Sequence, residues 1–151
     1  MVTITSNSAA DTARVGECWG QSATAGWLIG FSGDLGAGKT QLVKGFARGL
    51  GVTTTVSSPT FVLIHEHEGG RLPLWHIDLY RLRDRDEIID AGIGDYFEEQ
   101  GGVVVVEWID RWFGEMDRLS FSRKVAGKLR LVRIGVIAEN ERRISYEDIG
   151  D

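Results

Sequence analysis

The chain has 151 residues, a formal net charge of −5 and a sequence pI near 5.2. This length suits one domain over residues 1–151, and the acidic balance argues against a broad electrostatic surface for nucleic acid. The single cysteine, Cys18, excludes an internal disulfide and a cysteine metal cluster.

No stretch of the chain is apolar enough to span a membrane, because the longest aliphatic run covers only residues 103–106. No signal peptide is visible, so we expect a cytoplasmic protein without membrane contact. Cys18 stands at helical spacing from Val15 and Trp19, which predicts a buried structural thiol.

The first third of the chain predicts two strand–helix pairs. Residues 2–5 favour a short strand, and Ser8 followed by Asp11 begins a helix that extends to about Gly20. Residues 27–31 are an apolar run typical of a buried strand. A second helix follows, ended by glycines, with apolar residues at three- and four-residue spacing: Leu42, Val43, Phe46, Ala47 and Leu50.

Between that strand and that helix lies a phosphate-binding loop motif, Gly33-Asp34-Leu35-Gly36-Ala37-Gly38-Lys39-Thr40. Glycines let backbone N–H groups curl around phosphates, and the following helix adds its positive N-terminal end. In such a loop Lys39 reaches the β/γ-phosphates and the Thr40 hydroxyl binds Mg²⁺. The motif, in its strand–loop–helix context, predicts binding of ATP with Mg²⁺.

The middle of the chain predicts a hairpin, short helices and a central strand. Residues 61–68 and 71–79 read as two strands joined at Gly69 and Gly70, with full pairing only after Pro73. Asp84 begins a short helix with apolar contacts from Ile88, Ile89 and Ala91, and Tyr96 and Phe97 form another turn. Residues 102–108 are a continuous apolar run, which predicts a fully buried strand.

The last part of the chain predicts a hairpin of residues 118–124 and 128–136 around Ala126 and Gly127, then a frayed polar end from about Glu139. Taken together, the elements predict a single-domain α/β protein with a P-loop NTPase-like fold. Its sheet is expected to be mixed and mostly parallel, flanked by helices and extended by antiparallel hairpins.

Three further residues qualify for the chemistry of the site. A P-loop needs a second carboxylate at a strand end, and Asp78 and Glu107 both stand there. Asp78 has a simpler alternative, a hydrogen bond or a pair with Arg81. Thr60 is either a switch residue that senses the γ-phosphate or part of an ordinary turn after Pro59.

The histidines and a basic stretch carry weaker signals. His65, His67 and His76 fall in one hairpin, where a metal site with Asp78 competes with ordinary half-buried or surface histidine, the interpretation we favour. Six basic residues share a stretch without acids, and they favour a solvated hairpin face over a patch for RNA or an acidic partner. They are Arg118, Arg123, Lys124, Lys128, Arg130 and Arg133.

Read together, four motifs in residues 8–113 resemble the TsaE family (also known as YjeE), a bacterial P-loop ATPase family of tRNA threonylcarbamoyladenosine formation. The loop interior Asp34-Leu35-Gly36-Ala37 is similar to the family's. So are Ser58-Pro59-Thr60-Phe61, His76-Ile77-Asp78-Leu79-Tyr80-Arg81-Leu82 and Val106-Glu107-Trp108. The chain departs from many relatives at Gln41, where a second Thr is common, and at Ile109, where Pro is common.

The resemblance implies a weak ATPase that needs Mg²⁺ and works on the complex of TsaD with TsaB. It implies catalytic roles for Lys39, Thr60, Asp78 and Glu107, and Mg²⁺ ligands among Thr40, Asp78 and Glu107. Trp108 is expected to pack beside the nucleotide or at the partner surface. Nucleotide contacts are implied for Trp108 and for Gly33, Asp34, Leu35, Gly36, Ala37, Gly38, Lys39, Thr40 and Gln41. Direct contact with tRNA is left open.

Two other functions remain open on the sequence. A small-molecule P-loop kinase has this size, although no Arg-rich lid insertion is visible. A nucleotide-dependent binding module without turnover would keep Lys39 and Thr40 but would have no need for Glu107 to position water.

Overall fold

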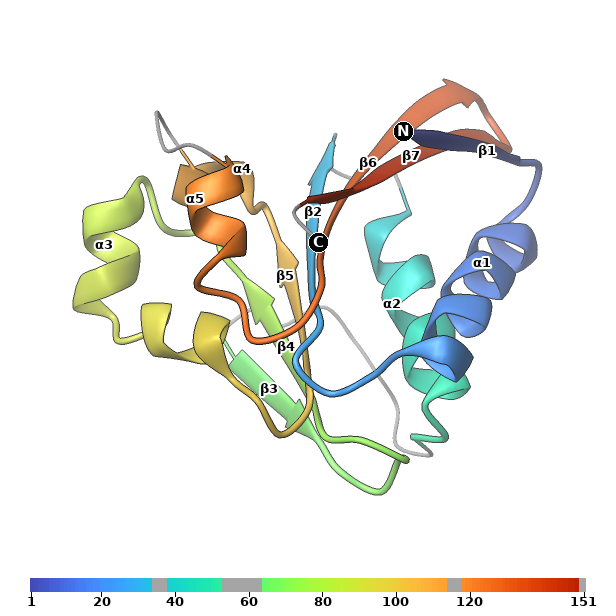
Figure 1. Cartoon of the computed structure of the whole chain (residues 1–151). Helices are drawn as coiled ribbons and strands as arrows, with labels where there is room; N and C mark the ends of the chain where they lie inside the picture. The colour runs from blue at the N-terminus through green and yellow to red at the C-terminus, as the bar shows by residue number, and fades with distance from the viewer. Residues whose placement is uncertain (34–37, 53–63, 114–117, 150–151) are drawn as a thin grey trace.

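The computed structural model describes residues 1–33, 38–52, 64–113 and 118–149. In these ranges a seven-stranded sheet lies between two layers of helices (Figure 1). The strands are β1 (Val2–Ser6), β2 (Leu28–Gly33), β3 (Ile64–His67), β4 (Leu74–Asp78), β5 (Val103–Glu107), β6 (Leu129–Ala138) and β7 (Glu141–Ile149). The helices are α1 (Ala9–Ser22), α2 (Lys39–Gly49), α3 (Arg85–Asp90), α4 (Asp110–Phe113), α5 (Arg118–Ser122) and the 3₁₀ helix η1 (Gly94–Glu98). Across the described ranges, no helix has the length and apolarity to cross a membrane.

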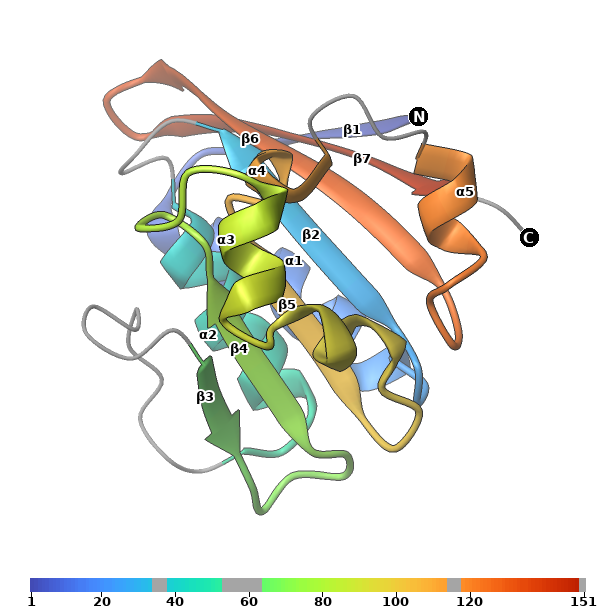
Figure 2. The same cartoon turned by 90° about the vertical axis from the view of Figure 1, so that its left-hand side faces the viewer.

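The sheet has the strand order β1-β7-β6-β2-β5-β4-β3 (Figure 2). Its centre is parallel, because β2 pairs with β5 and β6, and β5 pairs with β4. Both sides of that centre are antiparallel, through β3 against β4 and through the β6, β7 and β1 ladder. The predicted mixed α/β sheet is confirmed, although the expectation of a mostly parallel sheet fits only its four central strands.

The two faces of the sheet carry separate cores. One core holds buried residues of α1 and α2 with Ile29 and Phe31, and the other holds residues of the α3–α5 layer with Leu28 and Ile77. Figure 1 shows these two helix layers on opposite sides of the strands. Strand β5 is buried at every position, as its apolar run predicts, because helices cover both of its faces.

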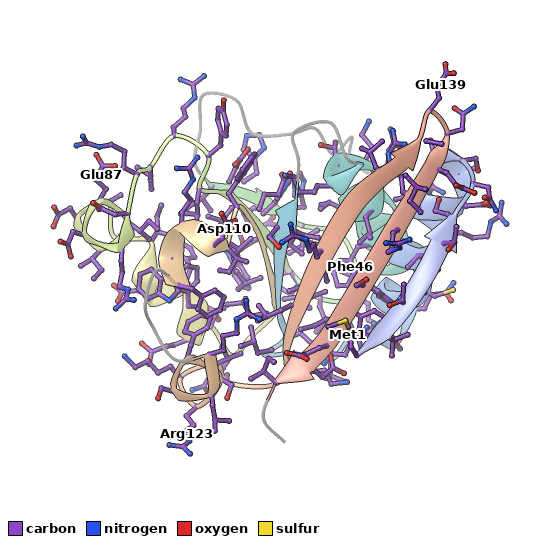
Figure 3. The ribbon with its side chains drawn as sticks, turned by 90° about the horizontal axis from the view of Figure 1, so that it is seen from above. Met1, Phe46, Glu87, Asp110, Arg123 and Glu139 are labelled. Carbon is purple, nitrogen blue, oxygen red and sulfur yellow. The ribbon has the colours of Figure 1, made fainter. Side chains whose placement is uncertain are left out.

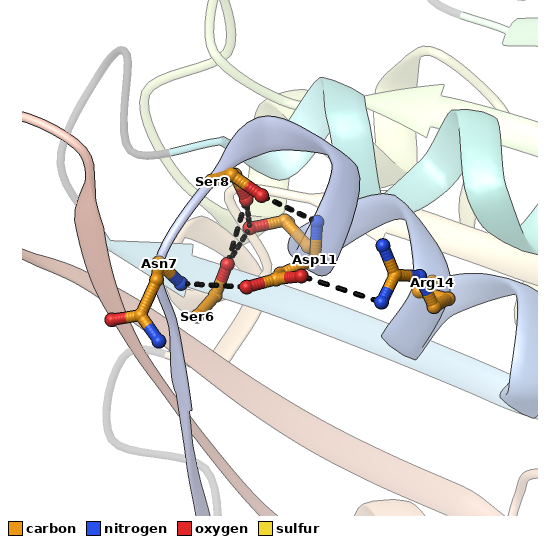
Figure 4. A network of polar contacts seen from close by, with 6 residues as sticks. Ser6, Asn7, Ser8, Asp11 and Arg14 are labelled. Atoms are coloured by element: carbon orange, nitrogen blue, oxygen red, sulfur yellow. Dashed lines mark hydrogen bonds and ion pairs between the residues drawn. The ribbon is translucent and has the colours of Figure 1, made fainter.

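Helix α1 begins where Ser8 predicts it to begin. The Ser8 Oγ accepts a hydrogen bond from the Asp11 backbone N–H at 3.0 Å, and the Asp11 carboxylate accepts one from the Asn7 N–H at 3.1 Å (Figure 4). Ser6 and the buried Thr12 join their hydroxyls at 2.7 Å beside this cap. The cap therefore ties the first turn of α1 to the end of β1.

Helices α1 and α2 approach so closely that only glycine fits at their contact. A Cβ added at Gly45 would overlap the Ala13 carbonyl oxygen, and one added at Gly16 would overlap the Leu42 carbonyl oxygen. Gly20 and Gly49 face the other helix in the same way. These four glycines, in two pairs spaced four apart, bring the two helix backbones into contact.

The prediction for the chain's end is wrong in two respects. Residues 118–122 form helix α5, because Phe121 packs into an aromatic cluster with Trp112 and Phe113 instead of pairing in a sheet. The residues expected to fray form β7, with Ile144 fully buried and β1 and β6 on its two sides. Figure 3 shows Glu139, which was expected to begin the frayed end, at the outer tip of the β6–β7 hairpin.

A buried arginine joins β6, β7 and α1. Arg130 donates to Asp148 through Nε at 2.7 Å and through a terminal nitrogen at 3.1 Å. Its guanidinium carbon lies 4.2 Å from the ring centroid of Tyr146 and 4.9 Å from those of Trp19 and Trp27. The hydrogen bonds from Arg130 hold the pKa of Asp148 below its ordinary value.

Smaller predictions divide between confirmed and wrong. A hairpin forms as predicted, with pairing that starts at Leu74 directly after Pro73, but its connection spans residues 68–73 and is longer than a turn at Gly69 and Gly70. Residues 61–63 of the predicted first strand lie outside the described residues. Asp84 caps α3 by accepting from the Glu87 N–H at 3.1 Å. Cys18 is exposed and not buried, because it lies on the outer side of α1 while Trp19 turns inward. Ile89 is likewise exposed, since a six-residue helix buries only one side chain, Ile88.

Candidate functional site

A glycine with positive φ stands at each end of the predicted phosphate loop. Strand β2 ends at Gly33, with φ 133°, and α2 begins after Gly38, with φ 102°. At both positions an L side chain is strained, and a Cβ at Gly33 would also overlap the Ile134 carbonyl. Asp34, Leu35, Gly36 and Ala37 lie outside the described residues. Thr40 and Gln41 are half-buried in the first turn of α2.

Lys39 is the buried cation of this site, with only 4% of its surface exposed. Its Nζ donates to the Gly33 carbonyl at 3.1 Å and lies 4.0 Å from the centroid of the Trp108 ring. The structure thus brings together two predicted nucleotide-site residues that are 69 positions apart in the chain. The face of an aromatic ring stabilises a cation through its quadrupole, so Trp108 compensates part of the buried charge.

Trp108 holds this place through a backbone conformation that local sequence does not favour. Its φ is 62°, which makes it the one residue other than glycine with positive φ in the described ranges. Tyr80 lies 5.2 Å from its ring, centroid to centroid, and the Arg111 guanidinium lies 5.5 Å away. A strained residue that contacts the predicted phosphate lysine is typical of a functional site.

The residue after Trp108 keeps the turn in register with β2. Ile109 donates its backbone N–H to the Phe31 carbonyl at 3.0 Å, and its side chain fills the space beside Gly30. A proline at this position would have no N–H to donate. The departure at Ile109 therefore adds a main-chain bond between β2 and the turn that carries Trp108.

The two predicted carboxylates meet at the carboxyl ends of neighbouring parallel strands. Asp78 ends β4 and Glu107 ends β5, and the two residues are register partners. Glu107 is 3% exposed and Asp78 is half-buried. The Asp78 Oδ1 accepts from the Tyr80 backbone N–H at 3.0 Å, so the hydrogen bond weighed as its simpler role is also present.

The pKa of Asp78 is affected by burial and by several neighbouring charged groups. Burial raises the pKa of Asp78 above its ordinary value, and the charge of Glu107 raises it further. The Tyr80 hydrogen bond is the strongest influence that lowers this pKa, and the charges of His76 and Lys39 also lower it. Two neighbouring acids at a strand end, beside the first turn of α2, fit a cation such as Mg²⁺.

The histidines differ from the favoured prediction of half-buried or surface positions. His65 is half-buried, but His67 is 8% exposed and His76 is completely buried. The His76 Nε2 lies 2.6 Å from the Glu107 Oε2. Burial, followed by the neighbouring histidines, lowers the pKa of His67. Within the described ranges no group of three or more potential ligands from His, Cys, Asp and Glu could hold a metal ion.

Sequence reasoning missed the link between His76 and Glu107. The available signal was the spacing of His76 and Asp78, which places both side chains on one face of β4. Pairing with β5 brings that face beside Glu107, and the sequence contains no local indication of which strand pairs with β4. Thr60, the predicted switch residue, lies outside the described residues.

The basic stretch does not form a single patch. Lys128 and Arg130 both pair with Asp148, whose carboxylate lies 3.6 Å from the Lys128 Nζ. Arg133 is exposed and stands at an odd position of β6, where side chains point to the opposite face from Arg130. Arg130 is therefore buried in the fold, whereas Lys128 stays partly exposed beside Asp148.

The sequence of this chain is similar to that of a known protein family. The sequence pattern of the family described as "Threonylcarbamoyl adenosine biosynthesis protein TsaE" matches residues 6–141. A tRNA threonylcarbamoyladenosine biosynthesis protein TsaE from Bacillus subtilis is 38% identical over 93% of this chain and 82% of its own length. A TsaE protein from Treponema pallidum is 36% identical over 93% of this chain and 96% of its own length. A TsaE protein from Nostoc is 45% identical over 66% of this chain and 63% of its own length.

The fold has a close counterpart among solved structures. The crystal structure of Bacillus subtilis YdiB matches with a TM-score of 0.75 and 30% sequence identity. The match covers 99% of this chain and 86% of that protein. The likeness therefore extends over both helix layers and the whole sheet.

Proposed function

Because the chain belongs to the TsaE family of tRNA threonylcarbamoyladenosine biosynthesis proteins, we propose that it binds and hydrolyses ATP and acts on the TsaB–TsaD complex. The observation that supports the ATPase part is that four predicted site residues form two neighbouring pairs in the fold. Lys39 lies against Trp108, and Asp78 and Glu107 stand side by side at the adjacent strand ends. Phosphoryl chemistry in P-loop proteins needs this combination of a cation and strand-end acids.

The proposal assigns the phosphates to the loop and to Lys39. Backbone N–H groups of residues 33–38 would bind the phosphate oxygens. Lys39 would leave its contacts with Gly33 and Trp108 and neutralise the charge of the phosphates. Thr40 with Asp78 and Glu107 would hold Mg²⁺, which supplies charge neutralisation on the phosphates. Gln41 and Trp108 would border the nucleotide.

The remaining roles concern hydrolysis. Thr60 would contact the γ-phosphate, an assignment that rests on its sequence motif alone. Glu107 would orient the attacking water through its carboxylate. Catalysis of this kind depends on positioning and electrostatic stabilisation, so the loss of the Lys39 charge is expected to be severe.

The test measures phosphate release from Mg-ATP by the chain alone and with added TsaB and TsaD. We expect weak release alone, strong stimulation by the pair, and a fall of about 100-fold or more for Lys39→Ala. Lys44→Ala, on the same helix, is the matched control and should retain the activity. Unchanged turnover in Lys39→Ala would contradict the assignment.

The same assay separates the two alternative functions. A small-molecule kinase would transfer phosphate to a metabolite and not to water, so a screen of acceptors would detect it. A binding module without turnover would bind ATP but release no phosphate with the partners present. Glu107→Gln would then retain full function in cells, whereas the ATPase proposal predicts a loss.

A further inference from the structure

We propose that His76 positions Glu107 by donating a hydrogen bond from Nε2 to one carboxylate oxygen, which orients the other oxygen for its role at the nucleotide. This inference rests on the proposed function, because it concerns how one residue of that site is held. His76 would act through Glu107 and would not touch the nucleotide itself.

The geometry of the pair is that of a strong buried hydrogen bond. The two side chains lie diagonally across β4 and β5, because Asp78 and not His76 is the register partner of Glu107. The Nε2–Oε2 distance is 2.6 Å, and the exposed fractions of the two side chains are 0% and 4%. A buried carboxylate needs a donor, and in the part of the chain that is described His76 is the side chain that supplies one to Glu107.

The chemistry of the carboxylate gives the direction of this hydrogen bond. His76 Nδ1 is buried and has no hydrogen-bond partner among the described residues. An ionised carboxylate can only accept a hydrogen bond, so the proton of this contact is on the His76 Nε2. The hydrogen bond therefore runs from the His76 Nε2–H to the Glu107 Oε2.

The bond leaves the second carboxylate oxygen of Glu107 for the site. The contact with His76 uses the Oε2 atom of Glu107 and not Oε1. Asp78 is held separately, by the Tyr80 backbone N–H. The two acids thus have independent anchors, and a residue that orients a metal-binding or water-binding carboxylate controls how well it binds.

The first experiment compares nucleotide affinity with and without Mg²⁺. A fluorescent ADP analogue is titrated into wild type, His76→Leu and His76→Gln, where the glutamine amide can replace the Nε2–H donor. We expect the gain in affinity from Mg²⁺ to shrink by about tenfold in His76→Leu and to be largely retained in His76→Gln. His65→Leu, at the position that pairs with His76 across β3 and β4, is the matched control.

The outcomes separate this inference from the proposed function. Wild type that fails to bind the analogue, with or without Mg²⁺, contradicts the proposed function and the inference with it. Wild type that binds with a gain from Mg²⁺, alongside a folded His76→Leu with the same gain, overturns the inference alone. An equal loss of the Mg²⁺-dependent gain in affinity in His76→Gln and His76→Leu also overturns the inference, because the glutamine amide can replace the donated hydrogen bond and leucine cannot.

A second measurement does not depend on the folding of a variant. Long-range ¹H–¹⁵N correlations in wild type report which ring nitrogen of each histidine is protonated, and the signals missing from His76→Gln assign those of His76. We expect a proton on Nε2. A proton on Nδ1 alone would mean that His76 accepts from Glu107, which overturns the inference.

Discussion

Asp78 binds its proton more tightly in the folded protein than a free aspartate does, because burial and the neighbouring Glu107 disfavour its charge. At neutral pH the folded state therefore carries an unfavourable charge at this position. Keeping two acids side by side therefore lowers the stability of the folded state. This cost can be measured at a single residue.

Asp78→Asn is expected to stabilise the protein at pH 7. The amide oxygen can still accept from the Tyr80 N–H, while the unfavourable charge is removed. Because the folded pKa lies above the ordinary 3.8, the wild type loses stability as the pH rises between these values. The advantage of the variant should therefore be largest at neutral pH and vanish below 3.8.

Urea unfolding of both proteins over a range of pH, without Mg²⁺, measures this difference. The same variant should bind nucleotide with less help from Mg²⁺, if Asp78 is a ligand. A variant that is less stable than wild type at pH 7 would show that the Asp78 charge is favourable in the fold. That result would contradict the raised pKa and its cause.

At the scale of elements, the contact between α1 and α2 positions the first turn of α2. Helix α2 carries Lys39 and Thr40 in its first turn, and Thr12 of α1 lies near Gly38. The two helices touch through backbone at Gly16, Gly20, Gly45 and Gly49. A shift of α2 away from α1 would move the lysine away from Trp108.

Gly45→Ala tests this contact, because helix propensity and packing predict opposite signs. Alanine is about 1 kcal/mol better than glycine in a helix interior, which would stabilise the variant. The added Cβ would overlap the Ala13 carbonyl, and such overpacking costs about 3 kcal/mol. We therefore expect a net loss of about 2 kcal/mol in the free energy of unfolding.

The matched control is Gly135→Ala on β6, where nothing lies within 4 Å of an added Cβ. Its stability should stay within about 0.5 kcal/mol of wild type, measured by the same denaturant unfolding. Stabilisation of the protein by Gly45→Ala would show that the helices can separate freely.

At the scale of the whole molecule, the last strand completes the sheet. Strand β7 lies between β1 and β6, so the two ends of the described chain meet there. Ile144 of β7 joins the core beneath α1 and α2, and Arg130 and Asp148 tie β6 to β7. The sheet that supports the site is therefore assembled from sequence-distant segments.

Ile144→Ala is expected to lower the free energy of unfolding by about 3 kcal/mol, because it empties a fully buried position. Ile137→Ala is the control, since Ile137 is an isoleucine of the same hairpin that is 43% exposed. The control should change stability by about 0.5 kcal/mol or less. Equal effects in the two variants, measured by chemical unfolding, would indicate that β7 frays.

The parts of the fold that local chemistry specifies were predictable. Gly33 and Gly38 adopt positive φ angles that favour glycine, and Ser8 and Asp84 cap helices. The four valines of β5 are apolar on both faces of the strand and are buried on both. For the same reason the loop motif and the two strand-end acids could be named as candidates. The hairpin assigned to residues 118–136 failed because its alternating pattern suits a strand, while Phe121 finds its partners in other segments.

The sequence by itself thus determined the nature of the site: a glycine loop, a lysine, and two acids at strand ends. Only the tertiary structure decided that Trp108 covers Lys39, that His76 binds Glu107, and that β7 enters the sheet. The physical reason is the range of the interactions. Caps, turns and apolar runs act between near neighbours in the chain, whereas these three contacts require strands that meet only in the folded sheet.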